Sequence, residues 1–525
     1  MSASREKKQR QTDPDGRLTQ KQLREQKEAQ AQKRKTILYS VIAAAAAVLV
    51  AALLIWNSGF FQGRTTAATV NGQAYTPADV SYYYHTALNQ EYMYAQYGIS
   101  SFDASVDPKE QYTDAEQTTS YYDQFVDSAL DQLTRITALV DAARADGFTA
   151  DDEVRTYVDT QLSTVDSSAA QYNRDRASYL KAVYGKYMTV ARFKTCLERE
   201  ALANAYYSAH QDALTYDSDA LERYYEENKN TLDTFDYSLC FINGKAADPT
   251  DANGDPVKDE DGNAVTATEE EQTQAMAAAR EKAQAMVDAL KAGGSFDTLA
   301  AEAVAGDEKS TNSGEQTLVG NSIPALLMDW LCADGRQTGD VDLVESEGNG
   351  YYVIRFENRY RDEESRATAD VRHILIKAEL AEGAEAPTDE AMEATKEKAQ
   401  SLLDQWKAGD ATAESFGELA NANSDDPGSN TNGGLYEGVT RGQFFTAFND
   451  WIFDASRKEG DTTLIENPQS GQQGWHVVYL EKLGDIQWSY TAANALKSDD
   501  MKTWITDLES SYVAETGSGI DYITA

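Results

Sequence analysis

Hydrophobic residues recur every three or four positions over residues 66–234, the periodicity of amphipathic helices. The pattern predicts helices over 121–145, 151–164, 177–213 and 218–230, preceded by a short strand and turn near residue 70. Thr76 followed by Pro77 predicts a further helix start, with threonine as the cap and proline in the first turn. We therefore expect this part of the chain to be a helical region.

The chain then changes character twice in the same way, which indicates an internal repeat of an α+β unit. Alternating apolar residues predict strands over 235–242 and 369–376. Each strand is followed by an acidic loop and then by a helix, over 271–292 and 391–408. Asp329-Trp330-Leu331 precedes a Gly-Asp pair by the same interval as Asp450-Trp451-Ile452. We expect two α+β domains, 235–361 and 366–485, and a C-terminal helical tail over 486–525.

Residues 36–56 form an uncharged stretch of 21 residues that separates two oppositely charged parts of the chain. At about 1.5 Å per residue this length spans a bilayer core. Residues 1–35 carry 11 Lys/Arg and 5 Asp/Glu, a local +6, whereas the remainder carries 36 basic and 82 acidic groups, or −46. The pattern predicts an uncleaved signal-anchor helix in the cell membrane, with a single pass and a cytoplasmic basic tail. A cleaved signal peptide is the alternative.

The acidic balance of the predicted outer region argues against nucleic-acid binding, because no basic stripe with interleaved aromatic residues is present. High like charge instead keeps a protein soluble while it handles sticky, unfolded chains. Cys196, Cys240 and Cys332 are odd in number and widely spaced, so we expect no disulfide framework. Their spacing is not typical of metal ligands either, and we expect neither a metal nor a cofactor.

Two of the four histidines in the chain, His373 and His476, lie in predicted strands of the second repeat. Between them come the segment Asp425-Asp426-Pro427-Gly428-Ser429, a Gly433-Gly434-Leu435 turn, and then Phe444 and Phe448. This order of residues resembles the parvulin (PpiC-type) domain of peptidyl-prolyl cis-trans isomerases. The resemblance implies a catalytic hydrogen-bonded cluster of His373, Asp426 and His476. It also implies that Leu435, Phe444 and Phe448 bind the substrate proline.

The first repeat differs from the second at the positions that carry this chemistry. Leu239 stands where the second repeat has His373, and Tyr352 stands where it has His476. A purely structural role for the histidines would have allowed them in both copies. We therefore expect the first repeat to be a degenerate parvulin-like domain and the second to carry the active site.

The whole chain resembles the membrane-anchored extracytoplasmic foldases of the PrsA and SurA type. That resemblance implies an α+β multidomain fold, with a transmembrane helix, a helical chaperone region over 66–234 similar to the SurA N-terminal region, and two tandem parvulin-like domains. It implies an extracytoplasmic isomerase and chaperone whose partners are unfolded or newly translocated polypeptides with X-Pro bonds. The alternative is a membrane-tethered holdase with inactive parvulin domains. The oligomeric state stays open.

Overall fold

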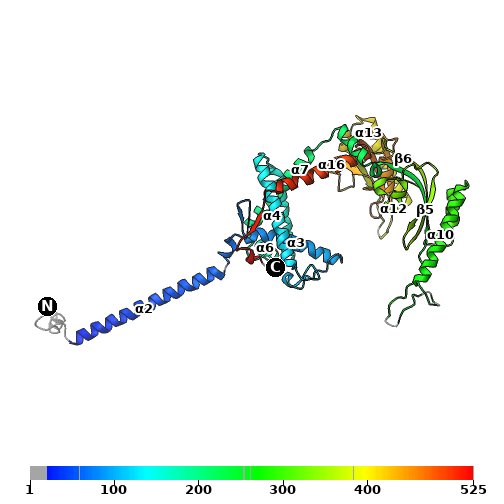
Figure 1. Ribbon diagram of the computed structural model, residues 1–525. Helices are drawn as coiled ribbons and strands as arrows, with labels where there is room; N and C mark the ends of the chain where they lie inside the picture. The colour runs from blue at the N-terminus through cyan, green and yellow to red at the C-terminus, as the bar shows by residue number, and fades with distance from the viewer. Residues whose placement is uncertain are drawn as a thin grey trace. The chain divides into compact units, whose positions relative to one another are not determined.

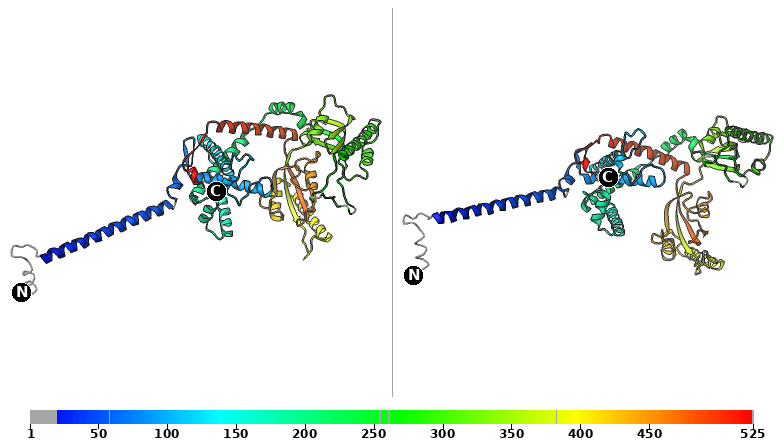
Figure 2. Two further views of the ribbon diagram at one scale, coloured as in Figure 1. Left: turned by 60° about the horizontal axis from the view of Figure 1, so that its bottom comes forward. Right: turned by 90° about the horizontal axis from the view of Figure 1, so that it is seen from below.

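The computed structural model describes residues 20–57, 59–251, 253, 255–259, 262–381 and 383–523 (Figures 1 and 2). The chain divides into two compact units, one formed by residues 1–214 with 500–525 and the other by residues 215–499. Both units combine helices with β-sheet, so the predicted α+β multidomain class is confirmed. The first 19 residues of the predicted basic tail lie outside the described residues.

The N-terminal helix α2 (Gln20–Asn57) contains the predicted membrane segment. Its stretch Lys21–Leu54 is long and apolar enough to cross a membrane, and no part of its most apolar window is buried in the protein. Large apolar side chains such as Ile37, Leu49 and Trp56 are more than half exposed. A helix that is apolar on all sides and uncovered by protein has the composition of a bilayer-spanning segment.

The rest of the first unit packs five helices around one aromatic-rich core. They are α3 (Pro77–Gln96), α4 (Tyr121–Ala145), α5 (Asp151–Gln171), α6 (Arg176–Tyr184) and α7 (Val190–Ala213). The short helices η1 (Gln62–Arg64) and η2 (Pro108–Glu110) lie in the connections. Thr76 and Asp79 form a capping box at the start of α3, where Pro77 occupies the first turn, so the predicted helix start is confirmed.

The C-terminal residues belong to this first unit. Helix α16 (Gln487–Glu509) passes into it, and Ile505 packs with Leu139 and Ala203. Strand β11 (Ala514–Thr516) then pairs with β1 (Ala68–Val70), which also pairs with β2 (Gln73–Tyr75). The red C-terminal residues therefore lie against β1 (Figure 2), and η4 (Ile520–Tyr522) follows β11. The predicted helical tail thus completes the helical unit.

One predicted helix, 177–213, is wrong as a single element. The structure has two helices, α6 and α7, separated at Gly185, which adopts φ +88° and ψ 161°. A residue in that conformation ends a helix, and glycine adopts it without steric cost. Thr189 then caps α7, because its side chain accepts a hydrogen bond from the Arg192 backbone N–H. The apolar periodicity runs through this break, which is why the pattern alone concealed it.

The second unit begins with α8 (Ser218–Glu227) and α9 (Lys229–Leu232), so the single helix predicted over 218–230 is also wrong as one element. The chain continues into two four-stranded antiparallel sheets. The first sheet contains β3 (Thr234–Asn243), β4 (Thr311–Val319), β5 (Val341–Ser346) and β6 (Gly350–Tyr360), with α10 (Glu269–Lys291), α11 (Phe296–Val304), η3 (Gly320–Ser322) and α12 (Ala325–Leu331). The second contains β7 (Thr368–Lys377), β8 (Leu435–Thr440), β9 (Thr462–Asn467) and β10 (Gly474–Leu483), with α13 (Asp389–Ala408), α14 (Ala413–Asn423) and α15 (Thr446–Ile452).

The two sheets have the same topology. The strand orders are β4-β3-β6-β5 and β8-β7-β10-β9, so in each the first and last strands along the chain are the central pair. In both, a long helix packs on the sheet, α10 in the first and α13 in the second (Figure 1). Residue Leu239 pairs with Ile354 as His373 pairs with Val478, so the register matches position by position. This agreement supports the internal repeat inferred from the sequence.

In both repeats a glycine at the start of the last strand allows the backbones of the two central strands to approach closely. A Cβ atom on Gly350 would lie 2.1 Å from the Ile242 carbonyl oxygen, and one on Gly474 would lie 2.1 Å from that of Ile376. Both distances are far shorter than any real carbon–oxygen contact, so only glycine permits the observed approach of the backbones.

We expect Gly474→Ala to destabilise the second sheet by about 1–3 kcal/mol, because the added methyl forces β10 away from β7. The urea dependence of hydrogen exchange in the β7 and β10 amides measures this locally in the full chain. The matched control is Gly409→Ala, whose Cβ would meet its nearest atoms at 3.5 Å. Equal effects of the two substitutions would contradict the steric argument.

Candidate active site

The candidate site lies on one face of the second sheet. His373 on β7 is opposite Val478, and His476 on β10 is opposite Leu375, so the strict alternation of strand side chains puts both histidines on the same face. Helices α13 and α14 cover the other face, and α15 covers this one through Phe448. Both imidazoles are almost completely buried, with 2 % of His373 and 5 % of His476 exposed.

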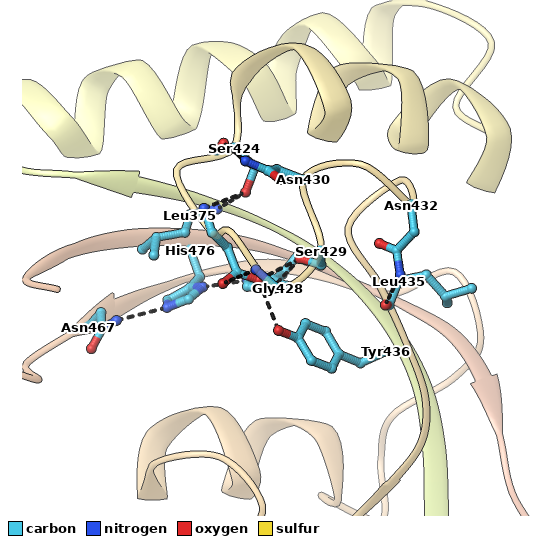
Figure 3. Close-up of polar contacts among 12 residues, drawn as sticks. Leu375, Ser424, Gly428, Ser429, Asn430, Asn432, Leu435, Tyr436, Asn467 and His476 are labelled. Carbon is cyan, nitrogen blue, oxygen red and sulfur yellow. Dashed lines mark hydrogen bonds and ion pairs between the residues drawn. The ribbon is translucent and has the colours of Figure 1, made fainter. Parts of the chain in front are cut away.

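The two histidines and Asp426 form one hydrogen-bonded chain. His373 Nδ1 lies 2.8 Å from His476 Nδ1, and His373 Nε2 lies 3.0 Å from Asp426 Oδ2. The same carboxylate oxygen accepts hydrogen bonds from Ser429 Oγ at 2.5 Å and from Tyr436 Oη at 3.0 Å. The structure thus brings together the three residues predicted to be catalytic, and it adds two hydroxyl donors. Figure 3 shows His476 with Asn467 on one side and with Ser429 and Tyr436 on the other.

A buried amide fixes the direction of these hydrogen bonds. Asn467 Oδ1 accepts from the Gln469 backbone N–H at 3.0 Å, so its Nδ2 is the group that faces His476 Nε2 at 3.1 Å. His476 Nε2 is therefore an acceptor, and its proton must be on Nδ1. That proton is donated to His373 Nδ1, which leaves His373 Nε2–H to donate to Asp426. Every group in the chain then has a partner with both imidazoles neutral.

The electrostatic environment stabilises this protonation pattern. The hydrogen bond from His373, with further donation from Ser429 and Tyr436, holds the pKa of the Asp426 carboxyl well below its ordinary range. Burial lowers the pKa of His476 to about 3, because an imidazolium is poorly solvated there. Burial and the contact with the Asp426 carboxylate raise the pKa of Tyr436, which therefore remains a donor. The lowered pKa of His476 keeps its imidazole neutral beside His373 and the Asp426 carboxylate.

Aromatic rings surround the histidine pair. The Phe448 ring is fully buried and meets both His373 and His476 edge-on, with centroids at 5.9 and 5.3 Å. Phe444 is only half-buried and lies 4.6 Å from the Phe448 ring and 5.3 Å from that of Tyr436. Partly exposed rings above a buried polar network form an apolar surface that a proline ring can contact.

Leu435 is not brought into this aromatic group. It pairs with Arg372 across the β7–β8 ladder, whereas Tyr436 pairs with Val371 on the face of the histidines. Figure 3 shows the Leu435 side chain directed away from His476. Of the three residues predicted to bind proline, the structure places Phe444 and Phe448 at the site, and Tyr436 stands where Leu435 was expected.

Sequence reasoning also missed the roles of Asn467, Ser429 and Tyr436. Ser429 belongs to the Asp-Pro-Gly-Ser segment that indicated the site, so a nearby hydroxyl could have been considered as a donor to Asp426. Asn467 lies next to His476 only because β9 pairs with β10. No local sequence signal indicates that pairing.

The first repeat fills the equivalent face with hydrocarbon. Leu239 and Tyr352 occupy the histidine positions and pack with Ile323 and Leu327 from the segment that corresponds to Phe444 and Phe448. The polar network is therefore a property of the second repeat.

Among the described residues no group of three or more His, Cys, Asp or Glu side chains is arranged to hold a metal ion.

The family comparison agrees with this geometry. Residues 351–482 match the model of the PPIC-type PPIASE domain, so the chain contains a domain of the parvulin class. The match begins within β6 of the first repeat and ends within β10, and it includes every residue of the histidine network.

Among curated proteins the chain is similar to the SurA chaperones. It is 29 % identical to Chaperone SurA of Pseudomonas putida over 186 residues, 33 % of this chain and 39 % of that protein. It is 27 % identical to the SurA of Pseudomonas aeruginosa over 239 residues, 43 % and 52 % of the two chains. The chain thus spans about two fifths of the length of the first relatives it matches. The chain therefore contains a parvulin-class domain and is similar in sequence to the SurA chaperones.

Solved structures similar to this chain include two PrsA proteins. The peptidylprolyl isomerase PrsA from Bacillus anthracis is 17 % identical, over 28 % of this chain and 59 % of that one, with a TM-score of 0.18. The foldase protein PrsA from Streptococcus pneumoniae is 16 % identical, over 49 % and 80 % of the chains, with a TM-score of 0.19. Overall similarity at these scores does not define the fold.

The depressed pKa of His476 predicts how the second sheet responds to acid. Unfolded histidine titrates near 6.5, so below that pH the unfolded chain binds a proton that the folded chain does not bind until about pH 3. The free energy of unfolding should therefore decrease as the pH is lowered from 6.5 to 5, by up to about 1.4 kcal/mol per pH unit. Hydrogen exchange in β7 and β10 measures it. His476→Gln should flatten this slope, and His210→Gln, in the first unit, should leave it unchanged.

Asn467→Asp tests the direction of the hydrogen-bond chain with almost no change in shape. A carboxylate accepts where the amide donates, so His476 must carry its proton on Nε2 or become charged. The ¹⁵N shifts of the imidazole should change from the Nδ1–H to the Nε2–H or imidazolium pattern, and the pKa of His476 should rise. Unchanged shifts in a folded variant would show that Asn467 does not set the tautomer.

Proposed function

We propose that this protein is an extracytoplasmic peptidyl-prolyl cis-trans isomerase and chaperone that assists the folding of secreted proteins. The observation that carries the proposal is the hydrogen-bonded chain from His476 through His373 to Asp426, beside the rings of Phe444 and Tyr436. It lies within the segment that matches the PPIC-type PPIASE domain. The catalytic group comprises His373, Asp426 and His476, and Phe444 and Phe448 bind the proline ring.

The chemistry required is rotation about an amide bond, with a barrier of about 18–20 kcal/mol. In the planar imide, resonance puts negative charge on the carbonyl oxygen, and this charge decreases as the bond twists. A carboxylate close to that oxygen destabilises the planar form more than the twisted one. Apolar contact with the pyrrolidine ring adds to this selectivity, because it holds the ring while the carbonyl turns.

The histidines act through Asp426 in this proposal. His373 fixes the position of the carboxylate, and its own position is fixed by His476 and then by Asn467. Such a chain keeps the carboxylate ionised and stationary while the substrate moves over it. In this proposal His373 is neutral. An imidazolium beside Asp426 would cancel the negative charge that destabilises the planar imide relative to the twisted one.

The chaperone part of the proposal rests on the helical unit. Helix α3 and the loop after it expose Tyr92, Met93, Tyr94, Tyr97 and Ile99, each by at least 41 %. Exposed aromatic and apolar side chains of this kind offer contacts to unfolded polypeptides. We assign the chaperone region to residues 66–234 with the tail 486–525, and parvulin-like domains to 235–361 and 366–485. The first of these lacks the histidines and is proposed to be non-catalytic.

The location follows from α2. We propose that residues 36–56 cross the cell membrane once, with residues 1–35 in the cytoplasm and the remainder outside. This arrangement holds the folding activity beside the membrane from which secreted chains emerge. The apolar helix and its uncovered surface support it.

A cis/trans assay on a short X-Pro peptide tests the isomerase in the full chain. Wild type should accelerate the exchange, and His373→Ala and His476→Ala should each lower kcat/KM by about tenfold or more, equivalent to about 1.4 kcal/mol of transition-state stabilisation. Glu437→Gln, an exposed change beside Tyr436, is the control and should be silent. Circular dichroism must show that all variants are folded. If wild type gives no acceleration yet suppresses aggregation of an unfolded client, the holdase alternative is correct.

A further inference from the structure

The first unit contains a cavity of about 340 Å³ directly after the membrane helix. Three segments line it: the linker residues from Gly59 to Arg64, the beginning of α3, and the α6–α7 connection created by the break at Gly185. None of these segments belongs to the second unit, so the cavity is independent of the histidine site.

The cavity is basic in a chain that is otherwise strongly acidic. Arg64, Lys181, Lys186 and Arg192 line it, and none of the residues lining it is Asp or Glu. Arg192 lies 3.4 Å from the buried Asp79 carboxylate, which also pairs with Arg199. The region after residue 35 carries 82 acidic and only 36 basic residues. The lining of the cavity therefore carries the opposite charge to the rest of this acidic region.

The cavity wall is built by specific packing. Cβ atoms placed on Gly59 and Gly63 would lie 2.6 and 3.0 Å from the Tyr187 ring, so the linker contacts this ring as closely as glycine allows. The Arg64 guanidinium lies 3.9 Å over the Phe60 ring and donates to the Phe60 carbonyl at 3.0 Å. Lys186 lies over the Tyr187 ring at 4.9 Å. The aromatic rings therefore position two of the four cations.

The chain connectivity limits how far the cavity can be from the membrane. Gly59 lies two residues after the end of α2, and an extended chain covers about 3.3–3.6 Å per residue. The cavity wall is thus within about 7 Å of the end of that helix. Lipid headgroups occupy a layer of roughly 5–8 Å on each side of the hydrocarbon core. Phe60 and Phe61, both about half exposed, are the apolar side chains at this level.

We propose that this cavity binds the phosphate group of an anionic lipid headgroup in the outer leaflet. Lys and Arg side chains recognise phosphate through charge-assisted hydrogen bonds, and Thr189 supplies a hydroxyl in the same wall. The inference rests on the single-pass topology proposed above. Headgroup binding fixes the helical unit close to the membrane, although the ectodomain as a whole is repelled by an anionic surface.

Hydrogen exchange of the full chain in nanodiscs tests the proposal. In discs of phosphatidylcholine with phosphatidylglycerol, amides of the linker and of the α6–α7 connection should exchange about tenfold more slowly than in discs of phosphatidylcholine alone. Lys181→Gln with Lys186→Gln should abolish the difference. Lys109→Gln with Lys194→Gln, the same loss of two charges elsewhere in this unit, should retain it. Exchange in α4 reports whether each variant is folded.

Three results would overturn the proposal. Equal protection in the two lipids means that the cavity does not recognise the anionic headgroup. Protection by inorganic phosphate in phosphatidylcholine discs, with none added by phosphatidylglycerol, means that the ligand is a soluble anion. A chain that does not enter the discs lacks the proposed membrane topology. Isomerase activity of the double variant separates these results from the function proposed for the second unit, since it should be unchanged.

Discussion

The hydrogen bond between two buried imidazoles on adjacent strands is the interaction on which the site depends. It exists only in one register of β7 against β10, because a shift by one residue would turn His373 or His476 to the opposite face. That register is held by the close approach of Gly474 to the Ile376 carbonyl. Backbone packing at the end of the strands therefore determines polar chemistry at their centre.

The two repeats show what the scaffold requires and what the site adds. Both have the same strand order, the same glycine at the start of the last strand and an apolar side chain from the short helix over the sheet, Leu327 or Phe448. Leu239 and Tyr352 fill the first repeat without any buried polar partner. Replacing them by histidines is tolerable only where Asp426 and Asn467 satisfy the two Nε2 atoms and the two Nδ1 atoms pair with each other, since an unpaired buried imidazole is costly. The two histidines and their hydrogen-bond partners therefore have to be present together.

Local sequence patterns predicted the α+β class, the repeat and most of the helices, because periodicity is determined by which face of an element is buried. They also placed His373, Asp426 and His476 together through the order of motif residues. They failed where the outcome depends on pairing between distant segments. The pairing of β8 with β7 determines that Tyr436, and not Leu435, faces the histidines. The pairing of β9 with β10 places Asn467 beside His476. The break at Gly185 was hidden by continuous apolar spacing.

The pairing of β11 with β1 makes the helical unit discontinuous along the chain, with residues 215–499 inserted between its parts. Because synthesis runs from the N-terminus to the C-terminus, β1 is made long before β11. The inserted unit can complete both of its sheets from consecutive residues, whereas the three-stranded sheet must wait for residues 514–516. The unit whose first residues are made first is therefore the last that can complete its sheet.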